Sequence, residues 1–268
     1  MTHSGIAALF AGLALAAPGW SAPSAAIRAA VANPARLDAE KPRDVYRHPA
    51  ETLDFFGVAP GQTVIEYSPG GGWYSRILVP LLAGNGHYGA AVPNNQRSRD
   101  GATKMLAAIP GGAGAPVTVF DPATATLGPA GTADRVLTFR NVHNLMMQRY
   151  SGVQDEKVAS AFFVAAFKAL KPGGMLGVED HRLPESASAE REKSSGYVKR
   201  STVVRLATAA GFKLAGESEI NANRKDTADW PKGVWTLPPS LDLGDQDRAK
   251  YVAIGESDRM TLRFVKPK

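Results

Sequence analysis

The segment that most constrains the fold is a strand that runs directly into a run of glycines and then into a helix. Residues 63–67 (TVIEY) are β-branched and apolar enough for a buried strand, and Ser68-Pro69-Gly70-Gly71-Gly72 follows at once. Residues 73–82 then repeat apolar side chains at helical spacing. A glycine loop at a helix N-terminus presents backbone N–H groups that a nucleotide-like ligand approaches closely, because no Cβ atoms intervene. The segment therefore predicts a nucleotide-type binding loop in an α/β protein.

Three ligand classes compete for such a loop. A phosphate-binding loop needs a lysine after its glycines, and Trp73-Tyr74-Ser75 supplies none. A dinucleotide loop needs a third glycine where Ser75 stands, and Glu66 brings a negative charge toward the pyrophosphate. A ligand with a cationic or zwitterionic part remains, and a purely structural glycine turn is the alternative to all three.

Strand and helix patterns alternate along the rest of the chain. Further strands are predicted at 87–92, 117–120, 135–139 and 175–179, and helices at 25–32, 48–56, 97–109, 154–170 and 202–210. Strands that alternate with helices pair in parallel and are covered on both faces. The last two predicted strands, 212–220 and 260–264, are expected to pair antiparallel. The segment between them, 221–257, is rich in polar residues, Pro and Gly, and we interpret it as a candidate lid.

Composition excludes several classes of protein. The 268 residues, 44% apolar and 21% charged, suit one globular α/β domain. The chain has no cysteine, which excludes disulfides, thiolate metal sites and cysteine nucleophiles. Lys and Arg outnumber Asp and Glu by 31 to 25, but the signs are interspersed and no basic stripe is present. We therefore predict no nucleic-acid partner.

The N-terminus has the layout of a signal peptide. Residues 5–17 are apolar or small, and Pro18-Gly19 and a stretch of small residues follow. The apolar run is shorter than the roughly 20 residues that span a bilayer, so no stable membrane anchor is predicted. Because residues 1–4 hold no Lys or Arg, an upstream start or a buried helix is the alternative. We expect a signal peptide over residues 1–22, cleaved between about 21 and 26, and an exported, periplasmic or secreted protein with a single domain over 27–268.

These features resemble class I S-adenosylmethionine-dependent methyltransferases, within a subgroup of exported, predicted members. Residues 66–72 are similar to the acidic–apolar–Gly–x–Gly–x–Gly loop of the family, with Ser68 in place of its first glycine. Residues 170–174 (LKPGG) are similar to its turn before strand five, and residues 69–74 and 139–144 resemble the subgroup. The resemblance covers roughly residues 45–268. It implies a Rossmann-like, seven-stranded, mostly parallel sheet with helices on both faces and a C-terminal antiparallel strand pair, and S-adenosyl-L-methionine as the cofactor.

The resemblance also implies a set of cofactor-binding residues. They come from the glycine loop and from the segment after the third strand: Glu66, Ser68, Gly70, Gly72 and Asp121, the last of these near the adenine. In the family, an acid at the end of the second strand holds the ribose hydroxyls. Here residues 90–95 contain no acid, and Asn94 or Asn95 is the candidate substitute.

Methyl transfer is an in-line displacement, so the protein orients the two reactants and supplies at most one base. His143 follows the fourth strand and Asp180-His181 follows the fifth, and the carboxyl ends of these strands are expected to be adjacent. We predict His143 or His181 as the base, Asp180 as its orienting carboxylate, and Asn141 as a hydrogen-bonding group for cofactor or substrate. The alternatives are structural hydrogen bonding in loops, or a metal site of His143, Asp180 and His181. No close His spacing supports that metal site, so none is predicted.

The prediction is therefore methyl transfer to a small-molecule or protein acceptor by an exported enzyme. A catalytically silent binding module on the same fold is the alternative, because Ser68 replaces a glycine and the second-strand acid is missing. An oxidoreductase on a dinucleotide-binding version of the fold is the third candidate.

Overall fold

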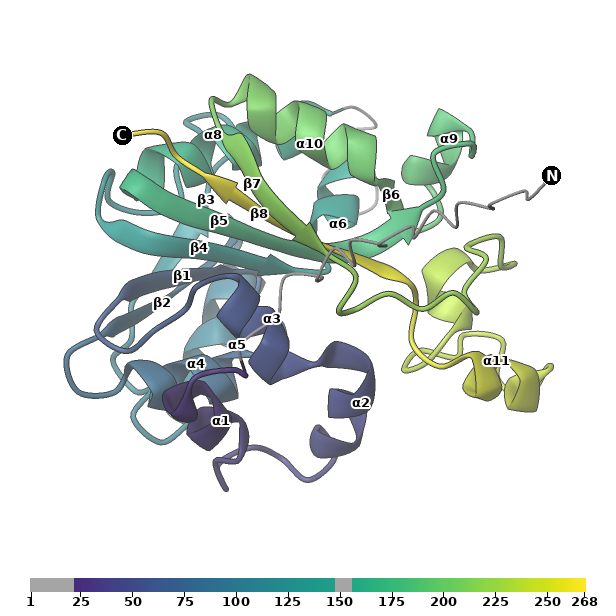
Figure 1. Ribbon diagram of the computed structural model, residues 1–268, viewed down its shortest axis with the longest axis horizontal. Helices are drawn as coiled ribbons and strands as arrows, with labels where there is room; N and C mark the ends of the chain where they lie inside the picture. Colours follow the sequence, from purple (N-terminus) through teal and green to yellow (C-terminus); the bar gives the residue numbers. More distant parts are fainter. Residues whose placement is uncertain (1–21, 148–155) are drawn as a thin grey trace, which may run out of the picture.

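The computed structural model describes residues 22–147 and 156–268, and residues 1–21, where most of the predicted signal peptide falls, lie outside this part of the chain. One eight-stranded sheet forms the centre of the molecule, in the order β3-β2-β1-β4-β5-β8-β7, and the short β6 pairs with β5 beside this row. Helices cover both faces of the sheet (Figure 1). The α/β fold predicted from the sequence is confirmed, with β6 added to the seven expected strands.

The strands are Thr63–Tyr67 (β1), His87–Pro93 (β2), Val117–Phe120 (β3), Ala133–Phe139 (β4), Leu170–Leu183 (β5), Val198–Lys199 (β6), Lys213–Ser218 (β7) and Arg259–Val265 (β8). Strands β1 to β5 pair in parallel, and β8 pairs antiparallel with both β5 and β7. The expected C-terminal antiparallel pair is therefore present. Strand β5 begins at Leu170, earlier than predicted, because the LKPGG segment already pairs with Ala133 of β4.

The helices are Ala25–Val31 (α1), Asp44–Arg47 (α2), Pro49–Phe55 (α3), Ser75–Leu82 (α4), Gln96–Ala107 (α5), Val142–Met146 (α6), Lys157–Ala169 (α8), Ala189–Glu192 (α9), Arg200–Ala209 (α10) and Arg248–Ile254 (α11). Two 3-10 turns, Lys41–Arg43 and Gly233–Thr236, accompany them. None of the helices in the described part of the chain is long and apolar enough to cross a bilayer.

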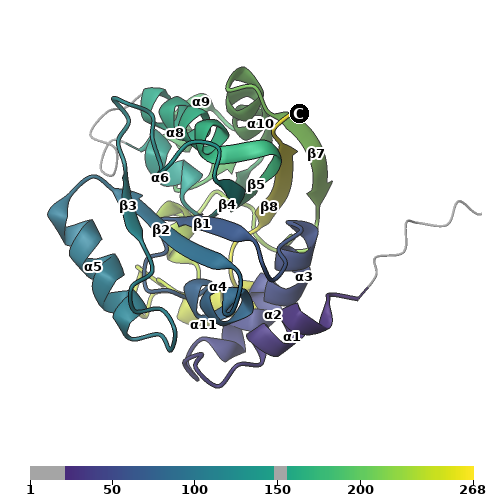
Figure 2. The ribbon, with the colours of Figure 1, turned by 90° about the vertical axis from the view of Figure 1, so that its left-hand side faces the viewer.

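Two apolar cores stabilise the sheet, one on each face. Helices α6, α8 and α10 pack on one face through residues such as Phe162 and Leu206, and α1, α3, α4 and α5 pack on the other through residues such as Leu53 and Ile77 (Figure 2). Strand β1 pairs with β2 on one side and β4 on the other, so the strand order reverses there. In open α/β sheets, ligands bind outside the carboxyl ends of the strands at such a reversal.

Two segments lie beyond those carboxyl ends. Helix α2 belongs to the N-terminal segment, and α11 belongs to the excursion over residues 221–257 that the sequence marked as a candidate lid (Figure 1). Side chains from both segments meet there, since Arg47 of α2 donates to Glu256, which follows α11. The N-terminal segment and the excursion therefore contact each other beside the predicted site.

Candidate functional site

The glycine loop after β1 adopts left-handed backbone conformations at three positions. The φ angles of Ser68, Gly70 and Gly72 are 51°, 57° and 85°. A Cβ on Gly72 would lie 2.5 Å from the sulfur of Met105 in α5, so this glycine is needed both for its φ and for helix packing. A Cβ on Gly70 or Gly71 would meet no atom within 4 Å, so one side of the loop faces open space. Ser68 has the left-handed φ that glycine adopts readily, at the energetic cost of a non-glycine residue in that region.

A cleft of about 480 Å³ opens beside this loop. It is lined by the loop (Ser68, Pro69, Gly70), by the end of β2 (Val92, Pro93) and by one side of α5 (Arg97, Ser98, Gly101, Ala102). Its volume lies within the roughly 300–1,000 Å³ of small-molecule sites. Of the predicted cofactor residues, Ser68 and Gly70 line this cleft.

Glu66 is buried, and its contacts hold the loop to the sheet. One of its carboxylate oxygens accepts hydrogen bonds of 2.7 Å from the hydroxyls of Ser75 and Tyr88. Burial raises the pKa of Glu66 to about 7, against the smaller lowering effect of these two hydrogen bonds. Glu66 therefore joins β1 to α4 and β2 as a carboxyl group that is partly protonated near neutral pH.

Asn141 connects the fourth strand to the glycine loop. Its side-chain N–H₂ donates to the backbone carbonyls of Tyr67, Ser68 and Phe139 at 3.1–3.3 Å. Asp121 lies at the end of β3 and accepts from the backbone N–H of Ala123 in a local turn. The structure thus assigns both side chains local hydrogen bonds, and it gives no contact that tests their predicted roles toward a cofactor.

The two asparagines after β2 are also engaged locally. The Asn95 side-chain oxygen accepts from the backbone N–H of Ser98 and caps α5, and the Asn94 side-chain oxygen accepts from Arg99. Arg97 and Ser98 are the polar side chains that line the cleft beside them. The sequence did not point to Arg97 and Ser98, because the family pattern directs attention to an acidic residue at the end of the second strand. These two residues are not acidic and lie in the following helix, α5.

His143 and Asp180 come together at the carboxyl ends of β4 and β5. His143 Nδ1 lies 2.7 Å from Asp180 Oδ1, and both side chains are buried. Because a carboxylate only accepts, His143 donates from Nδ1, and in the neutral ring this tautomer leaves the lone pair on Nε2. Asp180 Oδ2 accepts from the backbone N–H groups of Val142 and His143, so the same carboxylate caps α6. The structure thus brings together the two residues that the sequence predicted as base and orienting carboxylate.

His181 lies next to this pair, in a different environment. Its ring centroid is 4.9 Å from that of His143, and its Nδ1 lies 2.5 Å from the hydroxyl of Ser257. Burial, with added repulsion from His143 and Arg259, lowers the pKa of His181 well below its usual value. The ligand atoms of His143, Asp180 and His181 lie within 4.8 Å of one another, as a metal site would need. However, both oxygens of Asp180 already accept hydrogen bonds from His143 and from backbone N–H groups, an arrangement that orients an imidazole.

A set of buried and partly buried charged side chains next to these histidines was not predicted as part of the site. It consists of four arginines and two glutamates, named here the arginine cluster: Arg43, Arg47, Arg140, Arg259, Glu179 and Glu256. Glu179 and Arg140 flank predicted site residues in the sequence, and this adjacency was the available signal. The other four residues come from α2, its preceding turn, the end of the excursion and the start of β8, so only the tertiary fold identifies them.

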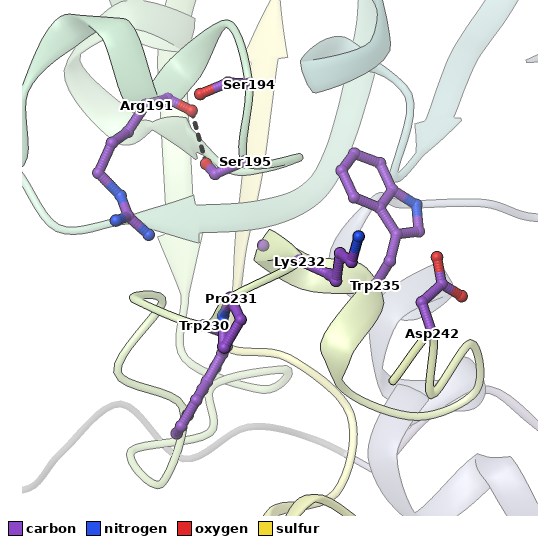
Figure 3. Close-up of a pocket in the computed structure, with 9 residues that line it drawn as sticks. Arg191, Ser194, Ser195, Trp230, Pro231, Lys232, Trp235 and Asp242 are labelled. Carbon is purple, nitrogen blue, oxygen red and sulfur yellow. Dashed lines mark hydrogen bonds between the residues drawn. The ribbon is translucent and has the colours of Figure 1, made fainter. Parts of the chain in front are cut away.

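A larger pocket, of about 630 Å³, is lined by residues of the excursion and by residues around α9 (Figure 3). Trp235 and Lys232 extend into it from one segment, and Arg191 with Ser195 comes from the opposite side. The ring of Trp235 lies 6.4 Å from that of His143. This pocket therefore ends near the predicted base.

Several solved structures share this fold. A methyltransferase from Aquifex aeolicus, described as S-adenosylmethionine-dependent, matches 84% of this chain and 92% of its own at 15% identity, with a TM-score of 0.53. A candidate sarcosine dimethylglycine methyltransferase from Galdieria sulphuraria matches 82% of this chain and 86% of its own at 12% identity, with a TM-score of 0.55. The [4+2]-cyclase SpnF matches 81% of each chain at 14% identity, with a TM-score of 0.54.

No family model and no curated protein sequence matches the chain. At these identities the likeness establishes the fold, which is that of the class I S-adenosylmethionine-dependent methyltransferases. The cyclase on this fold illustrates that fold alone does not determine the reaction.

Proposed function

We propose that this protein transfers a methyl group from S-adenosylmethionine to an acceptor that is a small molecule or a protein, outside the cytoplasm. The observation that carries the proposal is the His143–Asp180 pair, at 2.7 Å, on the same edge of the sheet as an open glycine loop. The fold neighbours support methyl transfer as the class of reaction. The predicted signal peptide supports the location.

The residues of the cleft fit the proposed donor. When bound, it would supply an electrophilic methyl group on a positively charged sulfur. Gly70 and Gly71 leave room beside the loop backbone, and the cleft of about 480 Å³ is large enough for an adenosyl compound. Ser98 and Arg97 supply hydrogen-bonding groups there in place of the family's acid.

The roles of the chain's own groups in the reaction follow from their protonation. His143 Nε2 accepts the proton of the acceptor's nucleophilic group, and Asp180 stabilises the imidazolium that forms. The proton leaves later to solvent. The lowered pKa of His181 makes that ring a weaker base than an ordinary imidazole, so His143 is the base that we propose.

Calorimetry with S-adenosylmethionine and S-adenosylhomocysteine tests the donor site. In Gly70→Leu the added side chain should enter the cleft, and we expect the affinity for both compounds to fall at least about tenfold, because the cleft loses volume. Gly131→Leu is the matched control, since Gly131 has a similar φ of 66° and open space around it, away from the loop. Equal affinities in the two variants, or no heat with the parent protein, would contradict the proposed donor site.

A further inference from the structure

The arginine cluster forms one continuous chain of ion pairs across the predicted site. Glu256 accepts from Arg43, Arg47 and Arg259 at 2.6, 3.0 and 3.0 Å. Arg259 lies 3.2 Å from Glu179, which in turn lies 3.3 Å from Arg140. This series of ion pairs extends from the N-terminal segment, through the end of the excursion, to the carboxyl ends of β4 and β5.

Positive charge exceeds negative charge in this cluster, in which Arg47, Arg259 and both glutamates are buried and Arg43 and Arg140 are partly exposed. Four guanidinium groups share two carboxylates, and Asp180, the next carboxylate, is already bonded to His143 and to backbone N–H groups. Even with Asp180 counted, the arginines are in excess by one, and Glu66 is only partly ionised near neutral pH. Burial and the charges of neighbouring arginines lower the pKa of Arg47 to about 9. Such an excess is costly in a protein interior unless an anion compensates it.

Several arginine donors have no acceptor within the described part of the protein. Arg259 Nε and Arg43 Nη2 are buried without a hydrogen-bond partner. The described residues give Arg47 an acceptor only for Nε, and Arg140 acceptors only for Nη1. A guanidinium carries five N–H donors in a planar fork that matches a carboxylate.

The position of the cluster relates it to the donor cleft. Arg140 directly precedes Asn141, whose side chain holds the carbonyl of Ser68 in the glycine loop. The guanidinium of Arg47 lies 4.8 Å over the ring of Trp73, which follows the last glycine of that loop. Arg140 also has a φ of 59°, a strained conformation of the kind that concentrates at functional sites.

Space for a small anion is present beside the cluster. A cavity of about 220 Å³ is lined by Arg259 and Glu256 together with Tyr46, His48 and Asn221. A carboxylate group is much smaller than this volume. The excess of about one positive charge is balanced by a monoanion, whereas a phosphate dianion would reverse the sign.

We propose that the arginine cluster binds a carboxylate of the methyl acceptor and places that acceptor beside the donor cleft. This inference rests on the proposed function. The carboxylate compensates the excess positive charge of the arginines. Binding of the acceptor therefore favours binding of the positively charged donor, and the two bind cooperatively. The acceptor's reacting atom is a separate group within reach of His143.

Acetate is the probe for this site, with acetamide as its neutral isostere. We expect acetate to cause a saturable shift of arginine Nε–H signals in the NMR spectrum of the full chain, and acetamide to cause none. Arg140→Gln and Arg47→Gln should weaken acetate binding at least tenfold. Arg205→Gln is the matched control, because Arg205 is an exposed arginine paired with Glu156 on the surface, and it should leave acetate binding unchanged. If a variant does not fold, the parent protein alone tests the inference: acetate should cause a saturable shift and acetamide should cause none.

The donor gives a second, independent readout. In calorimetry, acetate should raise the affinity for S-adenosylmethionine several-fold and leave the affinity for S-adenosylhomocysteine nearly unchanged. The reason is that only S-adenosylmethionine carries the positive charge of a sulfonium. No saturable acetate effect in the parent protein, or an undiminished effect in folded Arg140→Gln, overturns the inference. Acetate binding without any binding of the two adenosyl compounds overturns the proposed function and the acceptor's role, and leaves an anion site as the measured result.

Discussion

Asp180 accepts hydrogen bonds from both the ring and the backbone of His143, so one carboxylate sets the tautomer of the imidazole and the start of the helix that carries it. This double use explains why Asp180 is fully buried at the end of β5. The carboxylate loses its solvation but accepts charge-assisted hydrogen bonds at each oxygen. The orientation of the proposed base and the local fold therefore depend on the same side chain.

The first prediction concerns this pair. In Asp180→Asn we expect the Nδ1-protonated form of His143 to lose its dominance and the free energy of unfolding to fall by roughly 1–3 kcal/mol, because buried donors lose their charged acceptor. Histidine ¹⁵N shifts report the tautomer, and urea unfolding reports the stability. The exposed His87 serves as the internal control. An unchanged His143 tautomer in the variant would show that the carboxylate does not orient the ring.

A second prediction concerns Ser68, whose φ of 51° places a non-glycine residue in the left-handed region. Replacement by glycine removes strain of about 1–2 kcal/mol and adds a backbone entropy cost of roughly 0.5–1 kcal/mol. We expect Ser68→Gly to be as stable as the parent protein or slightly more stable, and Ser68→Val to be less stable. Urea unfolding of the three proteins checks this order. A clear loss of stability in the glycine variant would indicate that the serine side chain itself is needed.

Glu66 predicts a specific dependence of stability on pH. Its folded pKa of about 7 lies above the unfolded value of about 4.5, so the folded state binds the proton more strongly. This contribution to stability is fully present below pH 4.5, falls as the pH rises from 4.5 to 7, and is lost above that range. The total change is about 3 kcal/mol at 1.4 kcal/mol for each pKa unit.

The variant Glu66→Gln isolates this effect, because its side-chain oxygen still accepts from Ser75 and Tyr88. We expect the difference in unfolding free energy between the variant and the parent to rise in the variant's favour from pH 4.5 to pH 8. Urea unfolding at several pH values gives the difference and cancels the titration of other groups. A flat difference would mean that the pKa of Glu66 is the same in the folded and unfolded states.

The start of α1 favours cleavage at the N-terminal end of the predicted range, after Ser21, over cleavage at its other end, after Ala26. The Ser24 hydroxyl caps this helix by accepting from the backbone N–H of Ile27, a residue that is buried in the core. Cleavage after Ala26 would remove the cap, whereas cleavage after Ser21 keeps it. If the predicted signal peptide is processed, we expect a mature chain that begins at Ala22, as measured by intact mass. A mature chain that begins at Ile27 would contradict this expectation.

Much of the fold was predictable because its signals are local. Residues 63–67 form β1 and residues 117–120 form β3 as predicted, and β2 and β4 differ from the predictions only at one end each. The adjacency of His143 and Asp180 was predictable for a different reason. Neighbouring parallel strands bring their carboxyl ends to one edge, whatever the side chains are.

The sequence by itself therefore determined the strand and helix pattern, the glycine loop and the carboxyl edge where a site would form. Only the tertiary structure decided that Glu66 is a buried carboxyl group beside Ser75 and Tyr88, and that Arg47 pairs with Glu256 across more than 200 residues of chain. The physical reason is that propensity and periodicity act over a few neighbouring residues. Burial, pKa and charge balance depend on which distant side chains the packed sheet brings together.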